Sequence, residues 1–332
     1  MGQEKIKYLL YAEPQWLVNS FPGLPTNKTV MRKEDFPQPM QTGLFQWINV
    51  FDGDVGTPEL KELKDYDIIH MNLPPTNYGK ARFIKEYVGN KTKVVVNIDH
   101  AIDLWHTNGY NRIDILKKEI ESVDLAFCTE INASNMLSEI FGIRIPTIPH
   151  PVDYKYLSNI KKIEGKETKH IIVVSHRYDL NWLIPMLSVN SYLIKNKDKY
   201  LTTFVGALPD NPFDIYDSFD IVHSALPFSQ MIEYLNSADL VVDTAITRSY
   251  GRIVLECASM RVPCITNKSV MLGRELFNDL SIDIYNIKEM HSAMAWVLKT
   301  NQNSTDKSVY GSVSNVERYS AENSKERLLG YL

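Results

Sequence analysis

Short apolar runs alternate with longer amphipathic segments along the chain, and this alternation predicts an α/β protein. Nearly continuous apolar runs are typical of parallel strands that are buried on both faces. We expect strands at residues 8–11, 67–72, 93–98, 122–130, 170–177, 201–206, 240–242 and 264–266. Apolar positions at helical spacing predict helices at residues 78–88, 230–238, 251–260, 289–299 and 321–332.

Residues 26–60 interrupt this regularity, with prolines at 37 and 39 and glycines at 43, 53 and 56, so we expect irregular structure there. Within this segment Asp52 and Asp54 stand one residue apart, and two such carboxylates can hold a divalent cation on a nucleotide diphosphate. Asp-Gly-Asp is also an ordinary turn sequence, which is the favoured interpretation. No metal site is therefore expected.

The stretch from Ala238 to Asn267 predicts a strand, a polar loop, a helix and a second strand. The loop contains a single glycine, Gly251, and the apolar helical face begins directly after it. In an open parallel sheet such a helix starts at the carboxyl edge of the strands. Its free backbone N–H groups and its dipole favour a phosphate there. The stretch therefore predicts an anion-binding site.

Residues 249–265 resemble the donor-site signature of retaining glycosyltransferases with the GT-B fold, most closely the family-4-like group. In that group two glutamates bracket the loop and the first helical turns, and the second holds the nucleotide ribose. Glu256 matches the second glutamate, whereas Arg248 replaces the first. The donor-binding residues that the resemblance implies here are Arg248, Ser249, Tyr250, Gly251, Arg252, Ile253 and Glu256. Alternatively, Glu256 only complements the helix dipole.

Three other positions match the family in the second half of the chain. Arg177 follows a predicted strand, where the family uses an arginine to hold the diphosphate, but Trp182 replaces the family's lysine. Gly206 closes the next strand, and the backbone near Leu226 stands where the family reads the nucleobase. The resemblance thus implies donor binding by Arg177, Gly206 and Leu226.

Asp99 and His100 end the predicted strand at residues 93–98. The family has a histidine at the end of the matching strand, usually followed by an acid, and it contacts the sugar hydroxyls. Here the order is reversed. The resemblance implies catalytic roles for Asp99, His100 and Arg177, while a buried, hydrogen-bonded histidine is the alternative interpretation.

The resemblance implies two doubly wound, Rossmann-like domains facing across a cleft. Residues 142–153 are similar to the family's exit from its first domain. We therefore expect an acceptor-side domain at 1–155, a nucleotide-sugar domain at 156–310, and a C-terminal helix at 311–332 that crosses back to the first domain. A length of 332 residues is enough for two such cores.

Composition narrows the class of protein further. Hydrophobic residues make up 44% and charged residues 23%, which is typical of a globular protein. The net charge of −4 does not indicate electrostatic binding to nucleic acid by the chain as a whole. The chain contains no leader-like segment and no run of 18 apolar residues. Cys128, Cys257 and Cys264 lack metal-ligand spacing and suggest buried thiols in a reducing compartment. We therefore expect a cytoplasmic protein.

The function implied is transfer of a sugar from a UDP- or GDP-type donor to an acceptor hydroxyl, retaining and without metal or cofactor. Two alternatives stay open: a sugar-nucleotide epimerase on the same fold, and a non-catalytic sugar-nucleotide-binding subunit. The replacements at Arg248 and Trp182 favour the second alternative. The residues leave open the base, the sugar, the acceptor (glycan, lipid, protein or nucleic acid) and the oligomeric state.

Overall fold

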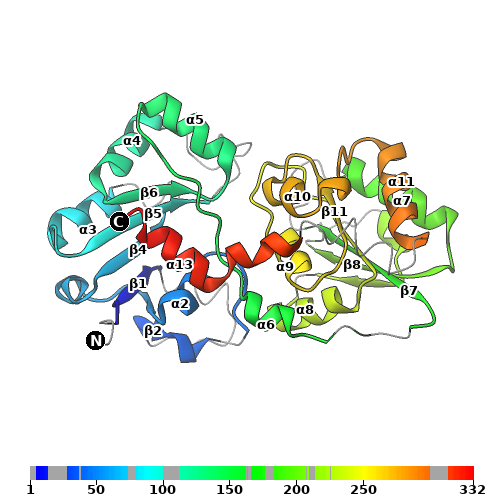
Figure 1. The fold of residues 1–332 in the computed structure, drawn as a ribbon, viewed down its shortest axis with the longest axis horizontal. Coiled ribbons are helices and arrows are strands. Elements are labelled where there is room, and N and C mark those ends of the chain that lie inside the picture. Colours follow the sequence, from blue (N-terminus) through cyan, green and yellow to red (C-terminus); the bar gives the residue numbers. More distant parts are fainter. Residues whose placement is uncertain are drawn as a thin grey trace. The chain divides into compact units, whose positions relative to one another are not determined.

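The chain forms two compact units in the computed structural model (Figure 1). The first unit comprises Met1–Asp153 and Tyr319–Leu332, and the second comprises Tyr154–Arg318. The structure describes residues 5–13, 28–36, 39–73, 79–99, 112–161, 163, 166–175, 183–206, 208, 214–224, 226–299 and 313–332.

A six-stranded sheet forms the middle of the first unit, counted over the described residues. Its order is β2 (Val30–Arg32), β3 (Asp54–Gly56), β1 (Tyr8–Tyr11), β4 (Ile68–Asn72), β5 (Lys93–Ile98) and β6 (Leu125–Cys128). β2 runs antiparallel to β3, and the other pairs are parallel. The chain therefore passes from β1 to β3 on one side and then returns to β4 on the other side of β1.

Alternate residues of the strands enter two separate hydrophobic cores, as the two-residue period of a strand requires. Tyr8 and Leu10 belong to one core, and Leu9 belongs to the other. The first core includes α2 (Gln46–Phe51) and α13 (Ala321–Leu329), and the second includes α3 (Lys80–Val88), α4 (Ile113–Ser122) and α5 (Ile131–Phe141). Helices thus cover both faces of the sheet.

The expectation of irregular structure at residues 26–60 is wrong, because β2, α2 and β3 lie there. The apolar run at 47–51 forms a buried helix, although a run this short does not distinguish a helix from a strand. Gly53 and Gly56 serve close packing: a Cβ on Gly53 would lie 2.7 Å from the Tyr8 carbonyl oxygen, and Gly56 has a φ of +143°. Gly56 therefore belongs to β3, and Gly53 directly precedes this strand and packs against Tyr8 of β1.

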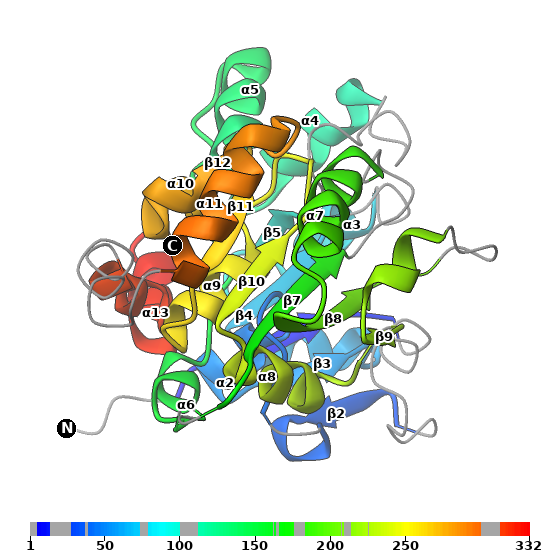
Figure 2. The same cartoon turned by 90° about the vertical axis from the view of Figure 1, so that its right-hand side faces the viewer.

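The described strands of the second unit form a six-stranded sheet in which every pair is parallel. The order is β12 (Ser281–Ile282), β11 (Cys264–Asn267), β10 (Leu240–Asp243), β7 (Lys169–Ser175), β8 (Tyr200–Gly206) and β9 (Ile221–His223). Figure 2 shows β10, β7 and β8 side by side. The chain moves from β7 to β9 in one direction and then returns to β10, so the direction reverses between β7 and β10.

The α-helices among the described residues of the second unit are α6 (Tyr154–Ser158), α7 (Leu183–Lys195), α8 (Phe228–Ser237), α9 (Arg252–Ser259), α10 (Met271–Leu276) and α11 (Ile287–Lys299). α7 packs against α11, and α8 packs against α9. Residues 171–174 of β7 and 240–242 of β10 are fully buried, as expected for strands that are covered on both faces. The predicted fold class is confirmed: each unit is a doubly wound α/β layer structure.

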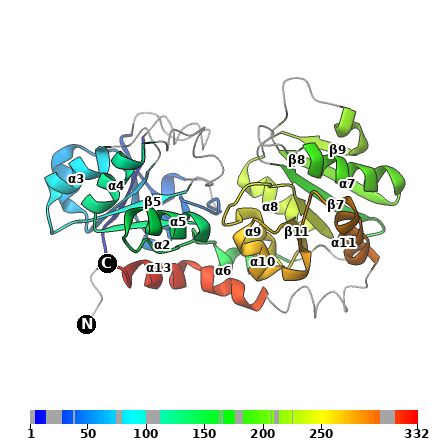
Figure 3. The same ribbon diagram turned by 90° about the horizontal axis from the view of Figure 1, so that it is seen from above.

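The C-terminal helix α13 belongs to the first unit and packs against α2 (Figure 3). Leu328 is fully buried in the core that contains Trp47, and Lys325 Nζ lies 5.3 Å from the centre of the Phe51 ring. The Val152 N–H donates to the Tyr319 carbonyl over 3.0 Å, which joins the two chain segments that form this unit.

Candidate functional site

The carboxyl ends of β7 and β10 form the switch point of the second sheet, where open α/β sheets bind their ligands. β7 ends at Ser175 and β10 ends at Asp243. Gly206 ends β8 in register with Ser175, and a Cβ on Gly206 would lie only 1.9 Å from the Ser175 carbonyl oxygen. Glycine is therefore required at position 206 by close approach of the two strands.

The loop that leaves β10 is fixed by hydrogen bonds at both of its ends. At the start, the Thr244 N–H and hydroxyl both donate to the Val174 carbonyl, over 3.0 and 3.1 Å. At the end, the carbonyls of Ser249 and Tyr250 accept from the N–H groups of Met271 and Leu272, over 2.9 and 3.0 Å. The loop therefore holds a defined backbone position ahead of α9.

Gly251 is the N-cap residue of α9, directly before Arg252, with a φ of +97° and a ψ of +68°. A Cβ there would lie 2.6 Å from Val270 Cγ1, so both backbone conformation and space favour glycine. The first N–H groups of a helix have no carbonyl partner within the helix, and here they belong to Arg252, Ile253 and Val254. The helix N-terminus at this edge suits an anion.

Arg252 lies close to two buried carboxyl groups. Its Nε is 3.8 Å from Glu256 Oε1, one turn along α9, and the Glu256 side chain is only 1% exposed. Asp243 is 4% exposed and accepts a hydrogen bond from the Ala245 N–H over 3.1 Å. Burial raises the pKa of Asp243 to about 6, against the opposing effects of the Ala245 N–H, Arg252 and the Thr266 hydroxyl. One arginine therefore balances part of the charge of two acids.

The other predicted donor residues occupy different environments around this edge. Arg248 is exposed, Ser249 is half-buried and Tyr250 is buried. Ile253 is buried beneath the start of α9, and Leu226 is half-buried between β9 and α8. The structure thus brings Gly206 and Leu226 to the strand edge at which the residues from Arg248 to Glu256 lie. His100 and Arg177 lie outside the described residues.

Asp99 lies in the first unit, directly after β5, and both of its carboxylate oxygens have partners. Oδ1 accepts from the Thr129 hydroxyl over 3.0 Å, and Oδ2 lies 3.1 Å from His150 Nε2. The Trp47 indole N–H donates to His150 Nδ1 over 3.0 Å. Because an indole N–H can only donate, His150 Nδ1 is the acceptor of this bond, and Nε2 is the ring nitrogen that faces Asp99.

A second buried network continues through the same sheet. His70 is fully buried, with Nδ1 2.5 Å from the Tyr8 hydroxyl and Nε2 3.0 Å from Asn97 Oδ1. Asn97 in turn donates to Asn72 Oδ1 over 3.2 Å. Burial, and next the neighbouring His150, lower the pKa of His70 to about 3, so the ring is neutral. Sequence reasoning missed this network and His150, whose only signal was the Pro-His-Pro run at 149–151.

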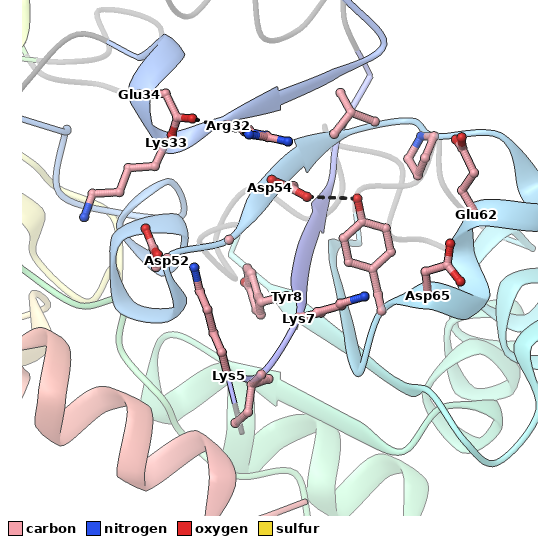
Figure 4. Close-up of a pocket in the computed structure, with 15 residues that line it drawn as sticks. Lys5, Lys7, Tyr8, Arg32, Lys33, Glu34, Asp52, Asp54, Glu62 and Asp65 are labelled. Atoms are coloured by element: carbon pink, nitrogen blue, oxygen red, sulfur yellow. Dashed lines mark hydrogen bonds and ion pairs between the residues drawn. The ribbon is translucent and has the colours of Figure 1, made fainter. Parts of the chain in front are cut away.

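A cavity of about 690 Å³ lies beside the amino end of β1 in the first unit (Figure 4). Asp52 and Asp54 are among its lining residues. Asp52 has a left-handed φ of +50° at the end of α2 and pairs with Lys5 over 2.5 Å, which lowers its pKa. Asp54 accepts from the Tyr66 hydroxyl over 3.0 Å. In the described parts of the chain, no three His, Cys, Asp or Glu side chains are grouped as a metal site would require.

The sequence matches no model of a known protein family and no curated protein sequence. Solved structures are similar to it in fold. The trehalose-6-phosphate synthase OtsA is 10% identical, with 98% of each chain covered and a TM-score of 0.63. Staphylococcus aureus TarM, solved with UDP, is 13% identical, with 80% of this chain and 55% of that chain covered and a TM-score of 0.56.

These similar structures are GT-B glycosyltransferases. The chain has the GT-B fold. A structure from Listeria monocytogenes assigned as a UDP-N-acetylglucosamine 2-epimerase shares this fold, at 14% identity, with 98% of this chain and 95% of that chain covered and a TM-score of 0.56. The GT-B fold therefore carries both of the enzyme classes that the sequence leaves open. No helix in the described ranges has the length and apolar character to cross a bilayer.

Proposed function

We propose that the protein is a glycosyltransferase that moves a sugar from a nucleoside-diphosphate sugar to an acceptor hydroxyl. The observation that supports this most is the edge of the second sheet, where the Gly251-capped helix, Arg252 and buried Glu256 lie together. GT-B structures such as OtsA and TarM have the same fold, and TarM was solved with UDP. At this edge the nucleotide would bind with its diphosphate on the helix N-terminus.

Cleavage of the sugar–phosphate bond leaves negative charge on the diphosphate. The N–H groups at the start of α9 and the guanidinium of Arg252 are positioned to stabilise that charge. Arg177 supplies a second cation in this proposal, and Asp99 and His100 serve the sugar or the acceptor. The reaction is proposed to be retaining and independent of metal or cofactor, so turnover should survive chelation by EDTA.

Glu256 is proposed to hold the ribose, since an ionised carboxylate can accept from both hydroxyls of a vicinal diol. Replacing Glu256 by Gln removes one of these acceptors and should weaken donor binding by about 1.5–3 kcal/mol. Glu233 on α8 is exposed, and Glu233→Gln is the matched control. Unchanged donor affinity in Glu256→Gln, with the fold intact by circular dichroism, would leave Glu256 only a helix-dipole role.

The epimerase is the second candidate, because the Listeria structure covers nearly the whole chain. Donor consumption measured with and without an acceptor panel distinguishes the two. A transferase releases nucleoside diphosphate only in step with glycosylated product, whereas an epimerase converts the sugar nucleotide alone. Binding without either reaction would identify a sugar-nucleotide-binding subunit. The thiols of Cys128, Cys257 and Cys264 are free and buried, which fits a cytoplasmic location.

A further inference from the structure

His150 is a fully buried histidine to which the resemblance gives no role, and it lies directly beside Asp99 in the first unit. Its Nε2 is 3.1 Å from Asp99 Oδ2, which is close enough for a direct electrostatic interaction. The His150 side chain is 0% exposed, whereas the Asp99 side chain is 28% exposed. The ring therefore contacts the carboxylate from inside the protein, and a ligand can reach the carboxylate from outside.

The backbone holds His150 in place from both sides. The Cys128 N–H of β6 donates to the Pro146 carbonyl over 3.0 Å, and the Ile148 N–H donates to the Cys128 carbonyl over 2.9 Å. The segment before His150 is thus bound alongside the end of β6. After His150, the Val152 N–H donates to a carbonyl of the C-terminal segment over 3.0 Å. The ring consequently has a fixed position relative to the first sheet.

Asp99 lies at the carboxyl edge of that sheet. It follows Ile98, the last residue of β5, and open α/β sheets bind their ligands at this edge. Its Oδ1 accepts from the Thr129 hydroxyl over 3.0 Å, while Oδ2 faces His150. Contacts on both oxygens fix the plane of the carboxylate as well as its position.

Trp47 determines which edge of the His150 ring faces Asp99. The indole N–H is fully buried with its side chain and donates to Nδ1 over 3.0 Å. With Nδ1 used as an acceptor, Nε2 is the ring nitrogen that can donate toward Asp99. A flipped ring would break the bond from Trp47 and leave a buried N–H without its acceptor, which is costly. Trp47 therefore favours the observed orientation.

We propose that His150 is a positioning residue of the transfer reaction: oriented by Trp47, it holds the Asp99 carboxylate in place to accept a hydrogen bond from a hydroxyl of the sugar or the acceptor. This inference rests on the proposed function. His150 contacts no substrate in this proposal and acts through Asp99. A displacement of about 1 Å at a reacting group can lower a rate about 100-fold, so the placement of Asp99 matters for kcat.

The test is steady-state release of nucleoside diphosphate from UDP-glucose, UDP-N-acetylglucosamine and GDP-mannose with the acceptor panel. For the donor that turns over, Asp99→Ala should lower kcat about 100- to 1,000-fold. His150→Leu fills the space without a donor or acceptor and should lower kcat about 10- to 100-fold. His150→Gln keeps one acceptor and one donor and should stay within about five-fold of the wild type. Affinity for UDP or GDP alone should not change, since the proposed nucleotide site lies in the second unit.

A double-mutant cycle shows whether His150 acts through Asp99. In an Asp99→Ala background, His150→Leu should lower kcat no further. Trp47→Phe removes the indole N–H and should lower kcat about 3- to 10-fold in the wild-type background only, and it remains informative if His150→Leu does not fold. His170 is a buried histidine at the amino end of β7, so His170→Gln is the matched control and should leave kcat unchanged.

Each contrary result has a distinct meaning. An equal loss of kcat from His150→Leu in the wild-type and Asp99→Ala backgrounds would show a role in the fold alone, and it would overturn this inference while the proposed function stands. An unchanged kcat in a folded His150→Leu protein would overturn it as well. If the wild-type protein turns over none of the sugar nucleotides, the proposed function is overturned and this inference with it.

Discussion

Asp243 and His70 are buried titratable residues that respond to burial in opposite directions. Burial raises the pKa of Asp243 to about 6 and lowers that of His70 to about 3. Asp243 therefore binds protons more readily in the folded chain than in the unfolded chain, and His70 binds them less readily. The two residues make opposite contributions to the dependence of stability on pH.

Between about pH 4 and 6, Asp243 is protonated to a greater extent in the folded chain than in the unfolded chain. The contribution of Asp243 to the free energy of unfolding therefore falls as pH rises through that window. Replacing it by Asn should therefore stabilise the protein at pH 7, by about 1–3 kcal/mol, and change little at pH 4. Urea unfolding at both pH values measures this, with Asp279→Asn as the exposed control. A gain in the free energy of unfolding of equal size at the two pH values would contradict the raised pKa of Asp243.

For His70 the unfolded chain holds more protons between pH 3 and 6.5, so stability is lost as pH falls through this window. His70→Gln retains one donor and one acceptor but does not titrate. The acid-side slope of the free energy of unfolding should fall by up to about 1.4 kcal/mol per pH unit. A slope identical to that of the wild type would show that His70 does not stay neutral in the fold.

At the scale of elements, α9 depends on the backbone conformation of Gly251 and on its contact with Val270. A Cβ at position 251 would be 2.6 Å from Val270 Cγ1, and the φ of +97° is unfavourable for any other residue. The proposed function uses the N-terminus of α9, and this N-terminus is held in place on two sides. The loop connects it to β10, and Val270, the residue before α10, lies next to Gly251.

Gly251→Ala should cost about 2–4 kcal/mol of stability, as the sum of backbone strain and the clash with Val270. In a Val270→Ala background the clash is absent, and the cost of Gly251→Ala should fall to about 1–2 kcal/mol. A double-mutant cycle of urea unfolding separates the two contributions. Strict additivity of the two substitutions would show that the Cβ does not meet Val270.

At the scale of the whole molecule, the first unit is built from two distant parts of the chain. α13 contributes Leu328 to the core that contains Trp47 and Phe51, and Ser320 caps the helix by accepting from the Asn323 N–H over 3.3 Å. The C-terminal segment is therefore a structural part of the first unit.

Leu328→Ala should destabilise the first unit by about 2–4 kcal/mol and leave the second unit unchanged. Glu326 lies on the exposed face of the same helix, and Glu326→Ala is the control. Native-state hydrogen exchange reports the two units separately. Faster exchange in the second unit alone would contradict the assignment of α13 to the first.

The sequence correctly predicted those strands in which a short continuous stretch of the chain is buried, because the burial alone decides which residues occur there. Residues 171–174 lie in β7 and residues 240–242 lie in β10, because strands buried on both faces must be apolar almost throughout. Residues 26–60 were mispredicted because their pairing is remote: Val55 of β3 pairs with Leu10 of β1 and with Met31 of β2. The prolines and glycines of residues 26–60 indicate loops when the local sequence is considered alone, because the local sequence does not contain the strand pairing.

The same distinction holds for the candidate site. The Gly251 turn and Glu256 follow from a local pattern and were predicted as site residues, and their roles remain proposals. Asp243 was predicted only as the start of the polar loop after the strand at 240–242, because its relation to Arg252 depends on how α9 folds back over β10. Trp47 and His150 are 103 positions apart, and no local pattern predicts their hydrogen bond.

The central claim is that the carboxyl edge of the second sheet binds a nucleoside-diphosphate sugar. Amide hydrogen exchange with and without UDP- and GDP-sugars tests it most directly, because it locates the ligand on the chain. We expect saturating donor to slow exchange in residues 244–256, most strongly at the N–H groups of Arg252, Ile253 and Val254. Protection confined to the first unit, or none with any donor, would contradict the claim.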